Sequence, residues 1–251
     1  MTATDITGLI ERLRAAGALA PESPPEKTLN DGELRGVNCN ECGNMGYLLN
    51  VVDGICYTRE CKCMVQRRAL MQARKSGLDE TLSAYTFKAY KTPDDRYKKL
   101  KEKAVEYVRT GSGKWFYISG NPGSGKTHLC TAICGALLKA GQPIKYVVWR
   151  EIAQQLKAAI NEDSFVEIMD KLKRPAVLYI DDFLKGSVTD ADVNRAIEII
   201  NARYNMRSKR TIISSEMDIK DIRRIDEATG GRIHERCGGY CFKAPEVNWR
   251  N

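Results

Sequence analysis

The stretch WFYISGNPGSGKT, residues 115–127, reads as an apolar strand that breaks into a glycine-rich loop and then starts a helix. It has the GxxxxGK[ST] spacing of a phosphate-binding loop, in which glycines let the backbone N–H groups approach an anion and the following helix adds the positive end of its dipole. A plain glycine turn is the alternative. The predicted nucleotide-binding residues are Gly120, Asn121, Pro122, Gly123, Ser124, Gly125, Lys126, Thr127 and His128, although helix packing explains His128 better than catalysis does.

A second motif ends a buried strand. Residues 176–180, AVLYI, form an unbroken apolar run followed by Asp181 and Asp182. The carboxyl ends of parallel strands share an edge with the phosphate-binding loop, so this acidic pair has the position of a Walker B element; a surface turn is the alternative. Strands alternate with helices from residue 115 onward, which predicts an α/β fold with a parallel sheet between helices.

Composition and charge indicate the kind of partner and the cellular compartment. The 251-residue chain has a formal net charge of +8, which favours a polyanionic partner. No signal peptide and no apolar run long enough to cross a bilayer is recognisable, so we expect a cytoplasmic protein without a membrane partner. In that compartment the nine cysteines are expected to be thiols or metal ligands, not disulfides.

Four of the cysteines have the spacing of a metal site. Cys39 and Cys42 form a CxxC pair, and Cys61 and Cys63 close the segment after a gap that suits a hairpin. Two turns that each present two thiolates can surround a tetrahedral zinc ion, which would have a structural role here. Cys56 is a fifth candidate for the second pair, and a set of reduced buried cysteines is the alternative to a metal site.

The chain divides into three predicted parts. Residues 1–35 contain an amphipathic helix over residues 5–16, which could dock on a partner or pack on its own domain, and a stiff proline-rich linker. Residues 36–76 are the cysteine module with a connecting helix. Residues 77–251 form the nucleotide-binding domain.

Several segments in order resemble one family. The set ISGNPGSGKTHL (118–129), LYIDDF (178–183), RTIISSE (210–216) and GGRIHER (230–236), preceded by AYTF (84–87) and the cysteine module, is similar to the DnaC/DnaI-type helicase loaders. These are AAA+ ATPases related to the IstB-type transposition ATPases. The likeness covers roughly residues 36–245, and the cysteine arrangement looks most like DnaI and its bacteriophage relatives.

The resemblance implies a role for each motif residue. Lys126 would bind the β- and γ-phosphates of ATP, Thr127 and Asp181 would hold Mg²⁺, and Asp182 would orient the attacking water. Arg232 looks like an arginine finger that reaches a neighbouring subunit; Arg236 is its nearest rival, and ordinary ion pairs are the alternative for both.

Two features depart from the general AAA+ pattern. The sensor position at the end of the fourth strand reads Ser214, Ser215, Glu216. Because a carboxylate there would be repelled by a triphosphate, we expect Ser215 to be the sensor. The sequence also ends soon after Arg236, so no helical lid is expected and the adenine contacts must come from elsewhere.

The resemblance implies an ATPase that loads a replicative hexameric DNA helicase onto single-stranded DNA, with ATP/ADP, Mg²⁺ and Zn²⁺ as ligands and an ATP-dependent oligomer as the assembly. A transposition regulator on duplex DNA and a small-molecule P-loop kinase are the alternatives. A groove for single-stranded DNA could be lined by Phe165 and the basic residues Lys171, Lys173, Arg174, Arg207, Lys209 and Arg210.

Overall fold

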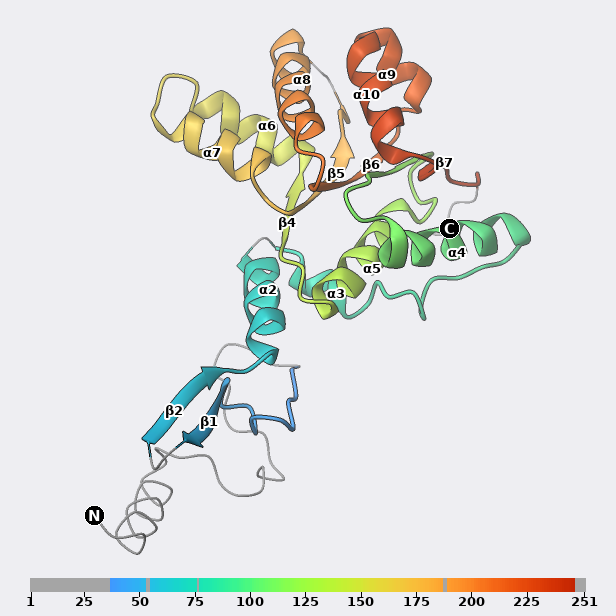
Figure 1. Ribbon diagram of the computed structural model, residues 1–251. Coiled ribbons are helices and arrows are strands. Elements are labelled where there is room, and N and C mark those ends of the chain that lie inside the picture. Colours follow the sequence, from blue (N-terminus) through green and yellow to red (C-terminus); the bar gives the residue numbers. More distant parts are fainter. Residues whose placement is uncertain (1–36, 53–54, 76, 187–188, 247–251) are drawn as a thin grey trace, which may run out of the picture. The chain divides into compact units, whose positions relative to one another are not determined.

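A computed structural model describes residues 37–52, 55–75, 77–186 and 189–246. These residues form two compact units, which are divided between Met71 and Gln72 (Figure 1). The predicted amphipathic helix and linker of residues 1–35 lie outside the described residues. Among the helices that are described, none is long and apolar enough to cross a membrane.

The first unit contains a β-hairpin. Strands β1 (Tyr47–Val52) and β2 (Ile55–Glu60) pair antiparallel, with Tyr47 opposite Glu60. Helix α2 (Cys63–Lys75) follows directly. Gly46, at φ +81°, precedes the hairpin, and a Cβ atom there would lie 2.6 Å from the Met64 sulfur. The predicted hairpin between the two cysteine pairs is therefore confirmed.

The second unit is built on a parallel sheet of five strands in the order β4-β5-β6-β3-β7. All four neighbouring pairs run parallel. The phosphate-loop strand β3 thus lies beside β6 and not beside the strand that follows it in sequence, which opens a crevice at the carboxyl edge where ligands of such sheets bind. The strands are β3 (Phe116–Ser119), β4 (Ile144–Val148), β5 (Val177–Phe183), β6 (Arg210–Ser215) and β7 (Cys241–Lys243).

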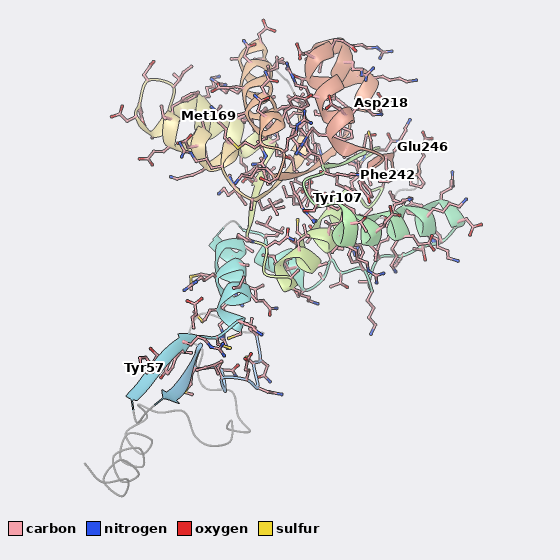
Figure 2. The ribbon with its side chains drawn as sticks, viewed as in Figure 1. Tyr57, Tyr107, Met169, Asp218, Phe242 and Glu246 are labelled. Atoms are coloured by element: carbon pink, nitrogen blue, oxygen red, sulfur yellow. The ribbon has the colours of Figure 1, made fainter. Side chains whose placement is uncertain are left out.

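Helices cover both faces of this sheet, as predicted for an α/β fold (Figure 1). Tyr107 of α4 packs on Phe116 on one side, whereas Met169 of α7 belongs to the large apolar cluster on the other side (Figure 2). The helices are α3 (Asp79–Leu82), α4 (Asp95–Thr110), α5 (Lys126–Lys139), α6 (Trp149–Ala158), α7 (Ser164–Lys173), α8 (Asp190–Asn205), α9 (Ile219–Ile225) and α10 (Glu227–Cys237).

The end of β5 differs from the sequence expectation. The strand was expected to end before Asp181, but it continues to Phe183. Its pairing with β6 is irregular between Ile180 and Phe183, and Asp182 has φ +54°. Successive side chains of a regular strand point to opposite faces, so an irregularity here changes the direction of Asp182 relative to Asp181.

Candidate functional site

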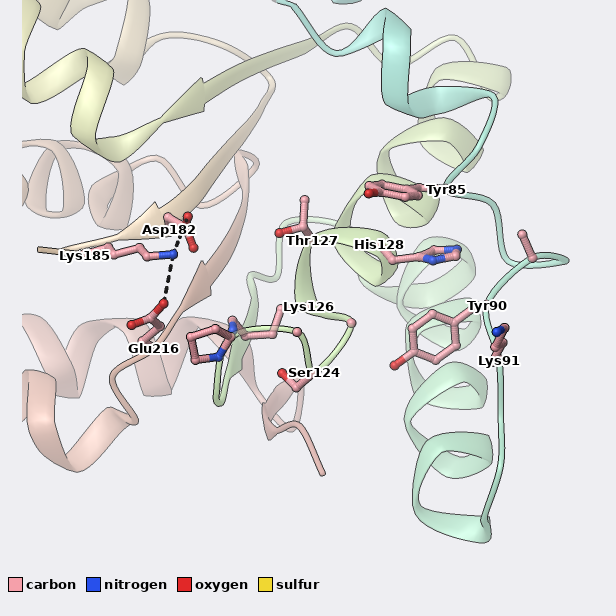
Figure 3. A pocket seen from close by; sticks show the side chains of 14 residues that line it. Tyr85, Tyr90, Lys91, Ser124, Lys126, Thr127, His128, Asp182, Lys185 and Glu216 are labelled. Carbon is pink, nitrogen blue, oxygen red and sulfur yellow. Dashed lines mark hydrogen bonds and ion pairs between the residues drawn. The ribbon is translucent and has the colours of Figure 1, made fainter. Parts of the chain in front are cut away.

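A pocket of about 350 Å³ lies over the phosphate-binding loop (Figure 3). One wall is the loop and the start of α5, and the opposite wall comes from the ends of β5 and β6. The segment between α3 and α4 closes a third side. Its lining residues are Tyr85, Ala89, Tyr90, Lys91, the run from Pro122 to His128, Asp182, Lys185 and Glu216.

The phosphate-binding loop has the positive φ angles that its glycines predict. Gly120, Gly123 and Gly125 have φ values of +144°, +79° and +84°, which side chains with a Cβ rarely adopt. Lys126 is only 6% exposed, and its Nζ donates to the carbonyls of Gly120 at 2.7 Å and Asn121 at 2.9 Å. Burial lowers the pKa of Lys126, while Glu216 and Asp182 oppose that shift. A triphosphate would offer this buried ammonium stronger partners than the loop carbonyls.

Asp181 faces the loop across the sheet edge. The Thr127 hydroxyl donates to Asp181 Oδ1 at 3.1 Å, so the predicted magnesium ligands do meet. Tyr146 donates to Oδ2 at 3.3 Å, and the Ser214 hydroxyl also donates to Oδ1. A hydroxyl and a carboxylate at this distance can share a Mg²⁺ ion after a small adjustment. Tyr146 and Ser214 come from other strands; no motif pointed to Tyr146, and Ser214 belongs to the segment expected to hold the sensor.

The sensor position differs from the expectation. Ser215 is fully buried and its hydroxyl donates to the carbonyl of Phe183 at 2.8 Å, so the structure does not bring this side chain into the pocket. Glu216 lines the pocket instead, and its Oε1 lies 2.9 Å from Lys185 Nζ. The carboxylate is therefore neutralised by a lysine that sequence reasoning missed.

An aromatic group borders the pocket beside the loop. The His128 ring stacks on Tyr85, with centroids 4.8 Å apart, and its Nε2 lies 3.0 Å from the carbonyl oxygen of Thr86. Tyr90 packs edge-on against the same ring and is only 4% exposed. Its hydroxyl has no hydrogen-bond partner in the described part of the chain, and burial raises its pKa. Buried hydroxyls are rarely left unsatisfied, so a ligand or water that reaches this group would supply its missing partner.

The two candidate finger arginines have different surroundings. Arg232 is half-buried, donates to Asn201 Oδ1 at 2.6 Å and lies over the Tyr204 ring. Arg236 is 7% exposed, and its Nη2 donates to the carbonyls of Gly113, Arg207 and Lys209 at 2.6, 3.0 and 3.2 Å. Neither lines the pocket. The buried Arg236 therefore donates to backbone carbonyls, whereas Arg232 stays partly exposed.

The basic residues considered for single-stranded DNA are already engaged. Lys171, Lys173, Arg174 and Arg207 pair with carboxylates, at 3.3, 2.6, 2.8 and 3.2 Å. Lys209 donates to the Arg174 carbonyl at 2.6 Å, and the buried Arg210 lies over the Tyr107 ring. Exposed ion pairs of this kind exchange partners at small cost, so the pairing neither supports nor removes this set as a DNA groove.

The four cysteines chosen from the sequence lie together in the first unit. The sulfur atoms of Cys39, Cys42, Cys61 and Cys63 are all within 4.8 Å of one another. The closest pairs are Cys39–Cys61 at 3.7 Å and Cys42–Cys63 at 3.6 Å. Tetrahedral zinc with bonds of about 2.3 Å places its sulfurs about 3.8 Å apart, so these residues fit the ion. The side chain of Cys56 is outside the described part of the structure.

Turn residues support this cluster. The Gly46 N–H donates to Cys42 Sγ at 3.3 Å. Asn44, at φ +65°, accepts through Oδ1 from the Cys39 N–H at 2.7 Å and from Arg67 at 2.9 Å. Hydrogen bonds of this kind orient thiolates around a metal.

A phosphate-binding loop, an acidic strand end facing it and a parallel sheet of this order define a P-loop ATPase of the AAA+ class. Residues 40–225 match the family model of IstB-like ATP binding proteins. The chain belongs to that family.

Curated relatives extend this assignment. The chain is 33% identical to YqaM of Bacillus subtilis (strain 168) over 198 residues, which are 73% of this chain and 62% of YqaM. It is 28% identical to the phage-like element PBSX protein XkdC of the same strain, over 96% of this chain and 93% of XkdC. The replicative helicase loader DnaC of Escherichia coli (strain K12) is 25% identical over 71% of each chain.

Solved structures confirm the fold. The crystal structure of DnaI superimposes with a TM-score of 0.56 at 22% sequence identity, covering 66% of this chain and 90% of DnaI. At that identity the likeness concerns the fold alone.

Proposed function

We propose that this chain is an ATP-dependent loader of a replicative DNA helicase onto single-stranded DNA. The observation that supports the proposal is a phosphate-binding loop whose Thr127 meets Asp181, in a chain that aligns with replicative helicase loaders over most of its length. The basic charge of the chain agrees with a nucleic-acid partner.

In this proposal the loop and the strand ends bind Mg-ATP. Lys126 leaves its loop carbonyls for the β- and γ-phosphates, and the loop N–H groups of residues 123–127 surround them. Thr127 and Asp181 hold Mg²⁺, which supplies charge neutralisation at the phosphates. Asp182 orients the attacking water.

The adenine base would lie against the aromatic wall. Tyr85, Tyr90 and Lys91 line this wall and come from the segment before α4. The free Tyr90 hydroxyl is a donor suited to a ring nitrogen of the base.

Arg232 would complete the site from a neighbouring subunit. Its guanidinium is outside the pocket of its own chain, yet it is half-exposed and held by one side-chain hydrogen bond. Such a cation can reach a γ-phosphate across an interface, which would make hydrolysis depend on an ATP-induced oligomer.

The cysteine cluster would bind structural zinc and serve, with the N-terminal residues, as the part that recognises the helicase. Four thiolates leave no open position for substrate, so a catalytic role for the ion is not proposed.

A binding experiment tests the loader proposal. The full chain is mixed with ATP, single-stranded DNA and a hexameric replicative helicase, and the mass of the complex is measured under native conditions. We expect a complex of the chain, the helicase and single-stranded DNA. Lys126→Ala should abolish this complex. Lys139→Gln, which changes an exposed lysine at the other end of α5, should leave it intact. If the chain binds none of the replicative helicases tested, the loader proposal is wrong.

The second candidate is a transposition regulator that assembles on duplex DNA, favoured by the description of the family whose model the chain matches. In that case ATP-dependent assembly would require duplex DNA and no helicase. A small-molecule kinase is the third candidate; it leaves the cysteine cluster without a use.

A further inference from the structure

Lys185 lies in the nucleotide pocket although none of the motifs includes it. It follows β5 in a tight turn, in which its N–H donates to the Asp182 carbonyl at 3.1 Å and Leu184 has φ +55°. Its Nζ lies 3.1 Å from Asp182 Oδ2 and 2.9 Å from Glu216 Oε1, and Figure 3 shows this ammonium between the two carboxylates. One cation therefore joins the ends of β5 and β6.

The charges around the pocket explain why a second lysine is needed. Asp182 and Glu216 line the pocket with Lys126 and Lys185. A triphosphate would be repelled by two uncompensated carboxylates, since like charges at such distances oppose each other strongly. Hydrogen bonding to Glu216, followed by Asp182, raises the pKa of Lys185 and keeps it a cation.

The two lysines differ in their freedom to move. Lys126 is 6% exposed and is held by the loop, whereas the Lys185 side chain is 41% exposed. An exposed lysine on a flexible stem exchanges one anionic partner for another at small cost. Lys185 can therefore respond to what occupies the pocket.

We propose that Lys185 contacts the terminal phosphate of a bound nucleoside triphosphate and gives up its hydrogen bond to Asp182 when it does so, while it still neutralises Glu216. This inference rests on the proposed nucleotide-binding function. With a triphosphate, Asp182 is freed to accept a hydrogen bond from water. With a diphosphate, Lys185 keeps its two carboxylate partners, so this residue distinguishes the two nucleotides.

The test measures binding of a non-hydrolysable ATP analogue and of ADP, with Mg²⁺, to the full chain by calorimetry. We expect Lys185→Gln to weaken the analogue about tenfold or more, the loss typical of a charged hydrogen bond, and to change ADP affinity less than about twofold. The matched control Lys139→Gln changes neither. No loss, or an equal loss for both nucleotides, overturns the proposal.

A double variant separates phosphate contact from simple neutralisation of Glu216. If Lys185 only cancels that charge, Lys185→Gln/Glu216→Gln regains the wild-type preference for the triphosphate, and the proposal is overturned. We expect the preference to stay lost. Glu216→Gln alone should strengthen binding of the analogue, because it removes a competitor for Lys185.

Lys126→Ala shows which of the two claims fails. If it abolishes binding of both nucleotides while Lys185→Gln behaves like the wild type, only the role of Lys185 is wrong. If the wild-type protein binds neither nucleotide, the proposed function and the inference are both overturned. The exposed Lys185 pairs contribute little to folding, so the variants should melt close to the wild type.

Discussion

Arg232 and Arg236 are four residues apart in α10, but the groups that surround them differ. Arg236 satisfies three backbone carbonyls from the residues around Gly113 and Arg207. Arg232 has one side-chain acceptor, Asn201, and remains half-buried. The resemblance put Arg232 first and Arg236 second, and the difference in burial agrees with that order.

We expect Arg236→Ala to lower the free energy of unfolding by about 2–4 kcal/mol, because it leaves buried carbonyls without donors. Arg232→Ala should cost no more than about 1 kcal/mol and should abolish most ATPase activity. Urea denaturation and steady-state hydrolysis measure the two effects. Stable protein with full activity after Arg232→Ala would contradict the finger assignment.

Tyr90 offers a second prediction at the same scale. Its buried hydroxyl has no protein partner in the described structure, so Tyr90→Phe should leave the free energy of unfolding unchanged or raise it by up to about 1 kcal/mol. ATP affinity should fall about fivefold if the base accepts that hydroxyl.

Tyr107→Phe is the matched control for this change. Its hydroxyl donates to the Lys114 carbonyl at 3.0 Å, so stability should fall by about 1 kcal/mol while ATP affinity stays constant. Thermal melts and titration with a fluorescent ATP analogue give both readings. If Tyr90→Phe leaves the ATP affinity unchanged, the adenine base does not bind the Tyr90 hydroxyl.

At the scale of elements, the hairpin of β1 and β2 brings the two cysteine pairs together. Its cysteines come from the turns on both sides of it, and the thiols meet only because the strands pair in the register that places Tyr47 opposite Glu60. A module of this size is usually stable only with a metal or disulfides.

Zinc removal should therefore unfold the first unit selectively. We expect about one zinc per chain, its loss in Cys42→Ser, and retention in Cys241→Ser, whose thiol lies in the other unit. Chelation should raise hydrogen exchange across residues 37–60 and leave the sheet protected. A chelated protein with unchanged exchange in the hairpin would rule out a structural metal.

At the scale of the whole molecule, the pocket is lined by Lys126 and Thr127 but by neither candidate arginine. A site of this composition is incomplete in one chain if Arg232 acts on a neighbour. Function would then follow the oligomer and not the monomer.

ATPase activity per chain should consequently rise steeply with protein concentration. Lys126→Ala and Arg232→Ala should each be inactive alone, and mixing them should restore part of the activity, since some interfaces then combine an intact loop with an intact arginine. Activity that is independent of concentration, together with no recovery on mixing, would place the whole site within one subunit.

Much of the fold and of the candidate site could be predicted because the residues that determine them are close together in the sequence. The glycine spacing of residues 120–125, the acids that follow an apolar run and the four cysteines depend on chain distances of a few residues, or on a simple hairpin. Strand β5 is longer than predicted because pairing with its neighbours continues through Asp181 to Phe183.

The sequence by itself determined that residues 115–127 build a phosphate-binding loop, because backbone freedom at glycine and the placement of a lysine are local properties. Only the tertiary structure decided what surrounds it. Lys185 meets Glu216 because two strands end side by side, and Tyr90 reaches the pocket because its segment packs on α5. Such contacts join residues far apart in the chain, and their chemistry depends on burial and direction, which no sequence motif records.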